Sequence, residues 1–296
     1  MKRFLARNAP GYLFLSPWLL GFFLLALGPI LVSLYLSFTR YDMVSDPRWV
    51  GLGNYEYMFS RDRRFWKALE VTFTYVVLAV PARLAFALAV AMLLDKGLRT
   101  IGLYRAIFYL PSLLGASVAI AILWRELFAA SGVVNEVLGF FGISGTDWIT
   151  NPKTSLYTLV ALAVWQFGSP MLIFLAGLRG IPRDLYEAAE IDGTPKWRQF
   201  TRITLPLLAP VIFFNLVMQM VQAFQEFNGP YIITQGGPLK ATYFLPLYIY
   251  ELAFKKFDMG YASAVAWVLF IIIMALTLVA FWSSKKWVYY AGDKRS

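Results

Sequence analysis

A row of polar side chains lies within an apolar segment in the last third of the chain. Gln219, Gln222 and Glu226 are spaced i, i+3 and i+7, so they share one face if the segment is helical. Amide and carboxylate groups can make paired hydrogen bonds to the hydroxyl groups of a sugar. Polar side chains inside an apolar span usually face a cavity or a partner helix. The row therefore predicts a ligand-binding face, with interhelical hydrogen bonding as the alternative.

Neighbouring residues extend this candidate binding face. Amides and aromatic rings lie beside the row, and a second apolar segment adds Trp165, Gln166 and Ser169 close to Gly168 and Pro170, which can break its regularity. The candidate substrate-binding residues are Gln219, Gln222, Gln225, Glu226, Phe224, Trp165, Gln166 and Ser169. Arg83 interrupts another apolar segment, and we expect a structural pair with an acid, with snorkelling and pathway lining as the alternatives.

Several kinds of chemistry are excluded by composition. The chain has no Cys and no His, which removes disulfides, thiolate metal sites and the commonest metal ligand. It has no G-x-x-x-x-G-K-[ST] phosphate loop and no recognisable catalytic pairing. We therefore expect no catalytic residue, no metal site and no cofactor in this chain, and no ATP hydrolysis by it.

The overall composition is that of a membrane protein. Of 296 residues, 59% are hydrophobic and only 15% are charged, with a mean hydropathy of +0.60, whereas soluble domains are about 25% charged. The net charge of +10 is compatible with nucleic-acid binding. Because the basic residues flank apolar segments, we instead expect membrane insertion and no nucleic-acid partner.

The apolar segments predict an all-α membrane protein with six transmembrane helices. A bilayer core of ~30 Å needs about 20 helical residues, and the candidate spans are Asn8–Thr39, Val71–Leu94, Ala106–Trp124, Thr154–Leu178, Ile203–Gln225 and Met259–Ser284. Residues 1–296 are expected to form a single transmembrane domain, with a six-helix core over about 66–284 and a first span over 11–39. Lys and Arg are more numerous on the side of the two termini, which places both termini in the cytoplasm.

A charged loop at 179–202 separates two of these spans on the same side of the membrane. Pro182 and Asp184 favour the start of a helix, and Gly193 can end it in the left-handed conformation. Thr194 and Pro195 then predict a second start, with Thr194 as the N-cap. This helix–elbow–helix segment is either a docking element or a plain interfacial connection.

The same loop carries a resemblance to a known family. Glu187-Ala188-Ala189, three residues, Gly193, nine residues, and Ile203-x-Leu205-Pro206 match the EAA motif of ATP-binding-cassette (ABC) importer permeases. Thr234-Gln235-Gly236-Gly237-Pro238, Tyr250, Phe254 and the stretch from Trp49 to Tyr55 resemble its sugar-importing, maltose/glycerol-phosphate-type branch. The first outer loop is short, whereas the maltose permease subunit has an inserted domain and extra spans.

The resemblance implies a division of labour between several chains. Glu187, Ala188, Ala189, Asp192 and Gly193 would form the helix that couples to a separate ATPase. The implied partners are a second homologous permease subunit, in a heterodimer, two ATPase subunits that bind ATP and Mg, and an extracytoplasmic solute-binding protein. The implied location is a bacterial-type cell membrane, and the implied cargo is a sugar moved by alternating access.

One alternative function stays open at this point. An ion-coupled secondary sugar transporter needs ionisable residues within the membrane, and the candidate spans offer few besides Arg83 and Glu226. A phosphorylated cargo would need several cations in a cavity, and the span Ile203–Gln225 offers none, which favours a neutral sugar.

Overall fold

Long apolar runs form helices because a helix pairs every backbone polar group within itself, as lipid requires. The computed structural model describes residues 13–95, 101–115 and 117–288. Within these described residues, four helices are long and apolar enough to cross a membrane: Leu13–Ser37, α4 (Arg63–Leu94), Lys196–Phe224 and α14 (Met259–Trp287). Two bent pairs, Ile101–Leu114 with Val118–Leu127 and Ser155–Trp165 with Gly168–Arg179, raise the number to six if each pair is one span. Each expected span overlaps one of these segments, and residues 8–12 of the first lie outside the described part.

The described chain divides into two compact units. The first contains residues up to Phe65 together with Ile249–Phe270, and the second contains Trp66–Tyr248 together with the residues from Ile271 onward. Helices α4 and α14 each contribute to both units. The expected first span therefore belongs to the first unit, and the loop at 179–202 belongs to the second.

The first unit is organised around the C-terminal end of the helix Leu13–Ser37. Its further elements are η1 (Phe22–Leu27), α2 (Gly28–Ser37), β1 (Thr39–Arg40), β2 (Arg48–Trp49), α3 (Gly53–Ser60) and η4 (Glu251–Lys255). The Asn54 side-chain amide donates to the carbonyl oxygens of Ser37 (2.8 Å) and Thr39 (2.9 Å). The bond to Ser37 satisfies a carbonyl group that the end of α2 leaves without a partner. Together the two bonds hold α3 against the start of the two-stranded β1–β2 sheet.

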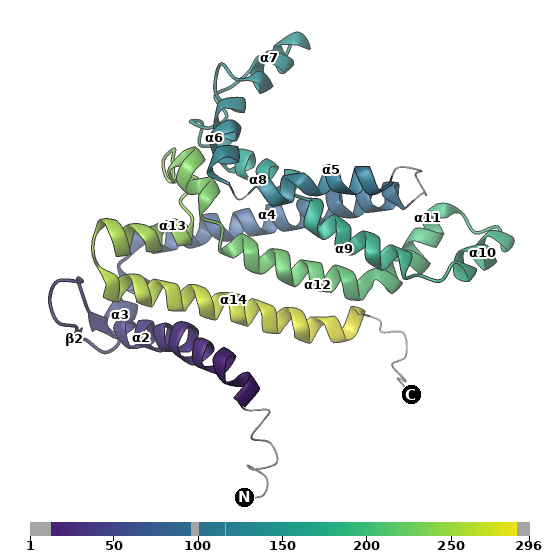
Figure 1. Ribbon diagram of the computed structural model, residues 1–296. Coiled ribbons are helices and arrows are strands. Elements are labelled where there is room, and N and C mark those ends of the chain that lie inside the picture. Colours follow the sequence, from purple (N-terminus) through teal and green to yellow (C-terminus); the bar gives the residue numbers. More distant parts are fainter. Residues whose placement is uncertain (1–12, 96–100, 116, 289–296) are drawn as a thin grey trace, which may run out of the picture. The chain divides into compact units, whose positions relative to one another are not determined.

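The second unit is a packed set of helices (Figure 1). Its elements are α5 (Ile101–Leu114), α6 (Val118–Leu127), α7 (Val133–Phe140), α8 (Ser155–Trp165), α9 (Gly168–Arg179), α10 (Asp184–Ile191), α11 (Lys196–Gln199), η2 (Phe200–Thr204), α12 (Leu205–Phe224), η3 (Pro230–Thr234) and most of α13 (Leu245–Tyr250). Helix α9 packs against both α5 and α12. Ala79, Ala87 and Ala91 are almost fully buried along α4, because small side chains let membrane helices approach closely.

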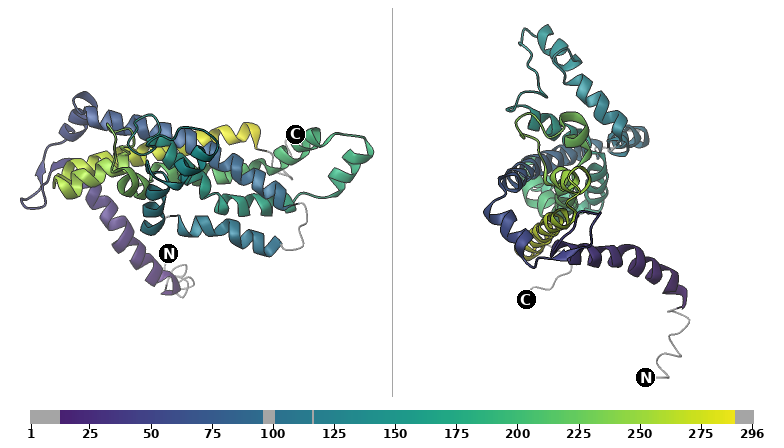
Figure 2. Two further views of the ribbon diagram at one scale, coloured as in Figure 1. Left: turned by 90° about the horizontal axis from the view of Figure 1, so that it is seen from above. Right: turned by 90° about the vertical axis from the view of Figure 1, so that its left-hand side faces the viewer.

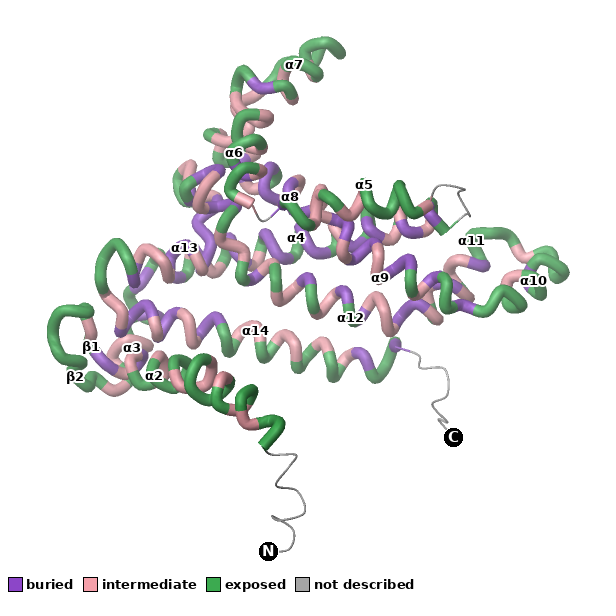
Figure 3. Tube along the Cα trace, viewed as in Figure 1, coloured by how far each residue is buried: buried purple, intermediate pink, exposed green. Residues whose placement is uncertain are grey.

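Burial differs sharply between helices, as the tube in Figure 3 shows. None of the most apolar window of Leu13–Ser37 is buried within the chain. An exposed apolar surface of this size is characteristic of contact with lipid or with another protein. The buried residues lie instead on other helices, among them α4, α8, α9, α12 and α14.

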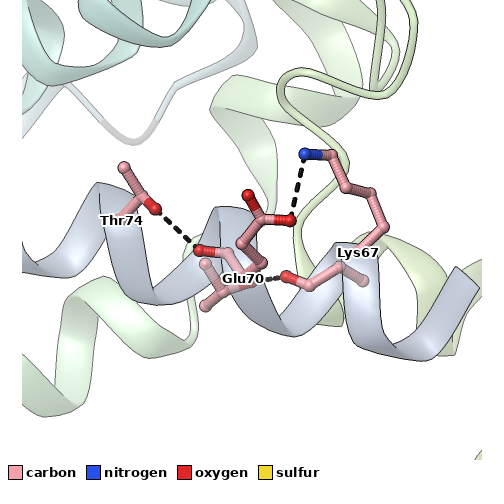
Figure 4. A network of polar contacts seen from close by, with 5 residues as sticks. Lys67, Glu70 and Thr74 are labelled. Carbon is pink, nitrogen blue, oxygen red and sulfur yellow. Dashed lines mark hydrogen bonds and ion pairs between the residues drawn. The ribbon is translucent and has the colours of Figure 1, made fainter. Parts of the chain in front are cut away.

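Polar residues occupy the first turns of α4 in the second unit (Figure 4). Lys67 Nζ lies 3.1 Å from Glu70 Oε2, and Thr74 Oγ1 donates to the Glu70 carbonyl at 2.8 Å. Both charged side chains are well exposed, so the pair contributes little to stability. The apolar, membrane-compatible part of α4 follows this polar start.

We predict that Gly260→Ala destabilises the first unit. A Cβ at Gly260 would collide with the Thr39 carbonyl oxygen and lie 3.0 Å from the Tyr41 nitrogen. Since both obstacles are backbone atoms, the loss should be roughly 1–3 kcal/mol, measured as a lower melting temperature in detergent. The matched control is Gly21→Ala in the same unit, where the added Cβ meets nothing within 4 Å. Equal melting temperatures for the two variants would contradict the prediction.

Candidate functional site

The site begins at a break between two helices. Helix α8 ends at Trp165, α9 starts at Gly168, and their axes differ by 44°. Pro170 causes the break, because it has no N–H to give to the carbonyl of Gln166, four residues earlier, and its ring clashes with that carbonyl. The Gln166 carbonyl is consequently left without its helical partner.

Two side chains from other helices donate hydrogen bonds to the Gln166 carbonyl oxygen. Arg83 of α4 donates to the Gln166 oxygen from both Nε, at 3.0 Å, and Nη2. Ser112 of α5 donates to the same oxygen at 2.8 Å and accepts the N–H of Ser169 at 3.0 Å. The break therefore joins α4, α5, α8 and α9 at one point. Arg83 was expected to pair with an acid, but the structure shows it bonded to a backbone carbonyl.

A cavity of about 310 Å³ lies beside this junction. Its volume is at the lower end of the ~300–1,000 Å³ range of small-ligand pockets. About half of its lining residues carry polar side chains, and the others are apolar. The lining residues are Tyr75, Ala79, Val80, Arg83, Ser112, Leu159, Leu162, Ala163, Gln166, Ser169, Gln219, Gln222, Ala223, Glu226 and Gly229.

The polar face of α12 forms one wall of the cavity. Gln219 is 4% exposed, and its Oε1 is buried without a hydrogen-bond partner among the described residues. Glu226, two residues beyond the end of α12, accepts the N–H of Gly229 at 2.9 Å. The wall thus presents an unused acceptor, a second amide at Gln222 and a carboxylate, which suit hydrogen bonding to a hydroxylated ligand.

The structure brings together five of the eight candidate substrate-binding residues. Gln219, Gln222, Glu226, Gln166 and Ser169 line the cavity.

The other three candidates lie elsewhere. Trp165 stacks against Trp124, with ring centroids 5.8 Å apart. Phe224 is buried edge-to-face against Phe73 at 5.1 Å, and Gln225 is exposed beyond the end of α12. None of the three is among the cavity-lining residues.

Two polar lining residues, Tyr75 and Ser112, were not among the sequence candidates. Tyr75 and Ser112 are ordinary members of apolar segments, and their positions depend on contacts between distant parts of the chain. One signal was available, because Tyr75 lies eight residues from Arg83 and so falls near the same face of a helix.

The loop at 179–202 projects beyond the ends of α9 and α12, as Figures 1 and 2 show. Helix α10 ends in a Schellman motif: Gly193 N–H donates to Glu190 O (3.0 Å) and Thr194 N–H donates to Ala189 O (2.8 Å). Gly193 has φ +68°, the left-handed conformation that the motif requires. The expected glycine C-cap is therefore present.

The expected N-cap at Thr194 is wrong. Helix α11 begins at Lys196 with Pro195 in the N-cap position, in an extended conformation. Thr194 is already engaged, because its N–H closes the Schellman motif and its carbonyl accepts from Gln199 Nε2 at 3.0 Å. The second helix consequently starts one residue later than expected.

The candidate coupling residues present a mixed surface. Glu187, Ala188, Asp192 and Gly193 are exposed, whereas Ala189 is buried. Ile191 and Trp197 are large apolar side chains that are 87% and 70% exposed near them. The loop is fixed to the membrane-spanning part by the hydroxyl–hydroxyl bond of Tyr186 and Thr204 at 2.8 Å. The loop therefore presents a partly apolar surface and is hydrogen-bonded to the start of the following helix.

Comparisons with known proteins show which family the chain resembles over most of its length. Residues 57–286 match the family described as binding-protein-dependent transport system inner membrane component. The chain is 49% identical to a probable ABC transporter permease protein, YesP, of Bacillus subtilis, over 97% of this chain and 94% of that protein. It is 35% identical to the lactose transport system permease protein LacF of Rhizobium radiobacter, over 97% of each chain.

A solved structure shares the fold. It is a bacterial alginate ABC transporter in complex with a periplasmic protein bound to an alginate pentasaccharide. One of its chains superimposes with a TM-score of 0.81 at 22% identity, covering 97% of both chains.

We predict that Arg83 and Ser112 are energetically coupled through the Gln166 carbonyl. Arg83→Leu or Ser112→Ala alone leaves this carbonyl one donor, whereas the double variant leaves it none. The double variant should therefore lose about 0.5–3 kcal/mol more than the sum of the single losses, measured by unfolding in detergent.

The matched control pairs Arg83→Leu with Thr74→Val. Thr74 bonds only its own helix, at Glu70, so this pair should be additive. Additivity in the Arg83/Ser112 pair as well would show that the shared carbonyl does not couple them.

Proposed function

Because this chain belongs to the binding-protein-dependent transport system inner membrane component family, we propose that it is the membrane-spanning permease subunit of an ABC importer that carries a sugar. The subunit itself is non-catalytic. Separate ATPase subunits bind ATP and Mg and drive alternating access of the cavity. The cargo arrives on an extracytoplasmic solute-binding protein.

The observation that carries the sugar assignment is the polar wall of the cavity. Gln219, Gln222 and Glu226 line one small space together with apolar side chains such as Leu159 and Leu162 and with further polar groups. This combination suits a sugar, whose ring faces are apolar and whose edges carry hydroxyl groups. One arginine and one carboxylate balance in charge, so a neutral sugar fits better than a phosphorylated one. The lactose permease named above supports the same class of cargo.

The loop at 179–202 is proposed to couple ATP hydrolysis to transport. It connects α9 to α12, the two helices that carry Ser169 and the polar wall. A movement of the loop would therefore displace both α9 and α12, which carry lining residues of the cavity. The surface proposed to contact the ATPase consists of four exposed residues and one buried residue, namely Glu187, Ala188, Asp192 and Gly193 with Ala189.

The arrangement in the membrane follows from charge. We infer that the loop and both termini lie in the cytoplasm, because Lys and Arg are more numerous on that side. The chain would then be a multi-pass protein of a bacterial-type cell membrane. Its second permease partner, in a heterodimer, and the bilayer would cover apolar surfaces such as that of Leu13–Ser37.

We predict that Gln222→Leu raises the KM of sugar uptake roughly two- to twelve-fold. This corresponds to the loss of about 0.5–1.5 kcal/mol for one hydrogen bond. Uptake of radiolabelled lactose and arabinose oligosaccharides by the complete importer in proteoliposomes is the measurement. The matched control is Met218→Leu on the same helix, which faces outward and does not line the cavity. An unchanged KM for Gln222→Leu, for any sugar that the wild type transports, would contradict the proposed wall.

We predict that Gly193→Val uncouples the importer while Gly193→Asn does not. No heavy atom lies within 4 Å of a Cβ at this position, so space is not the obstacle. A β-branched residue resists φ +68°, whereas Asn tolerates it. Coexpression with the neighbouring genes should recover an ATPase and a second permease with the wild type and the Asn variant. The Val variant should insert normally but lose the ATPase or ATP-driven uptake.

The opposite result is equally informative. Full ATP-driven uptake by Gly193→Val would remove the coupling role from the loop. A stable wild-type chain that takes up sugar alone, with an ion gradient and no ATPase, would support a secondary transporter instead.

A further inference from the structure

Asn215 extends the polar row of α12 beyond the cavity. Residues 215, 219, 222 and 226 follow one another at intervals of four, three and four, which keeps them on one helix face. Asn215 does not line the cavity. It lies one turn closer to Leu205, the end of α12 that leads into the loop at 179–202.

The side chain of Asn215 is fully buried and only half satisfied. Its Nδ2 donates to the Pro170 carbonyl at 3.4 Å, a long hydrogen bond that links α12 to α9. Its Oδ1 is buried and has no hydrogen-bond partner among the described residues. Gln219 Oε1, one turn away, is in the same condition.

Two buried acceptors without donors on one helix face need an explanation. Such groups are costly, and an apolar residue would pack in the same place without that cost. Ser155 Oγ is the third such atom in the described chain, but it lies on α8 and outside the row. Because Asn215 Oδ1 and Gln219 Oε1 lie on the same helix face, their lack of hydrogen-bond donors points to a ligand path rather than to general imperfect packing.

Resting on the proposed function, we propose that the translocation path continues from the cavity along α12 to Asn215, and that the Asn215–Pro170 bond closes it. The closed arrangement is the one in this structure, in which Asn215 is 0% exposed. Opening requires α9 and α12 to separate at this bond. The loop at 179–202 joins the far ends of these two helices, so its movement can separate them. Asn215 Oδ1 and Gln219 Oε1 then offer successive hydrogen-bond acceptors to sugar hydroxyls, and the freed Nδ2 of Asn215 offers a donor.

The absence of Cys from the chain allows a direct test. Single variants Asn215→Cys, Gln222→Cys and Ser155→Cys would be assembled with the partner subunits in inside-out membrane vesicles. A membrane-impermeant maleimide would be added without nucleotide, or with ATP and vanadate. The rate of labelling of this chain is the measurement, and it needs no knowledge of the sugar.

The expected result is that Asn215→Cys labels at least tenfold faster in one nucleotide condition than in the other, while Ser155→Cys stays unlabelled in both. If the Asn215→Cys complex is not recovered, Val211→Cys, one turn further on the same face, gives the same reading.

Other outcomes separate the two proposals. If Gln222→Cys responds to nucleotide and Asn215→Cys never labels, the cavity stands and the extended path is wrong. If Ser155→Cys labels as fast as Asn215→Cys, the opening is general loosening, and the closing role of Asn215 is wrong. If neither Gln222→Cys nor Asn215→Cys responds, the proposed function fails and the extended path fails with it.

Discussion

The carbonyl of Gln166 is the acceptor on which the site depends. Pro170 cannot donate to it, so a polar group within the apolar interior must find other donors. Arg83 and Ser112 supply them, and in doing so they bring α4 and α5 to the break between α8 and α9. The cavity lies beside this junction. A local defect in one helix is thus the feature that holds the others in place.

This arrangement also gives Arg83 a physical reason to be where it is. A charged side chain in the interior of a membrane helix is expensive unless its donors are used. The Gln166 oxygen accepts from two nitrogens of the guanidinium. A carboxylate partner would neutralise the arginine, whereas the carbonyl leaves its positive charge at the cavity wall. The cavity can therefore keep Glu226 and Arg83 as separate polar groups.

Much of the helical architecture could be predicted from the apolar runs, because length and composition decide membrane spans. The site could be predicted where one helix face was enough, as for Gln219 and Gln222. Phe224 shows the limit: it lies only two residues from Gln222, but two residues turn a helix by about 200°, which points its ring away. The partner of Arg83 lies 83 residues further along the chain, and such contacts leave no local pattern.

The stretch from Trp49 to Tyr55, which resembles the sugar-importing branch in sequence, has a structural role after the first long helix. Gly51 adopts φ +57°, and Asn54 then reaches back to the carbonyls of Ser37 and Thr39. Trp49 stacks on Phe38, with ring centroids 5.5 Å apart. Trp49, Gly51 and Asn54 of this stretch therefore contribute to the contacts at the end of the helix. The stretch from Trp49 to Tyr55 therefore holds the end of α2 and the start of α3 together within the first unit.

The elbow at Gly193 imposes a requirement of handedness. The backbone there needs the left-handed conformation, and the space beside it is empty on the side where an L-residue would place its Cβ. Glycine is accepted because it is achiral. A D-amino acid introduced by chemical ligation would prefer this very conformation and would hold the elbow more firmly than glycine does. A comparison of a D-residue with the same L-residue at this position would therefore vary the stiffness of the connection between α10 and α11 through stereochemistry alone.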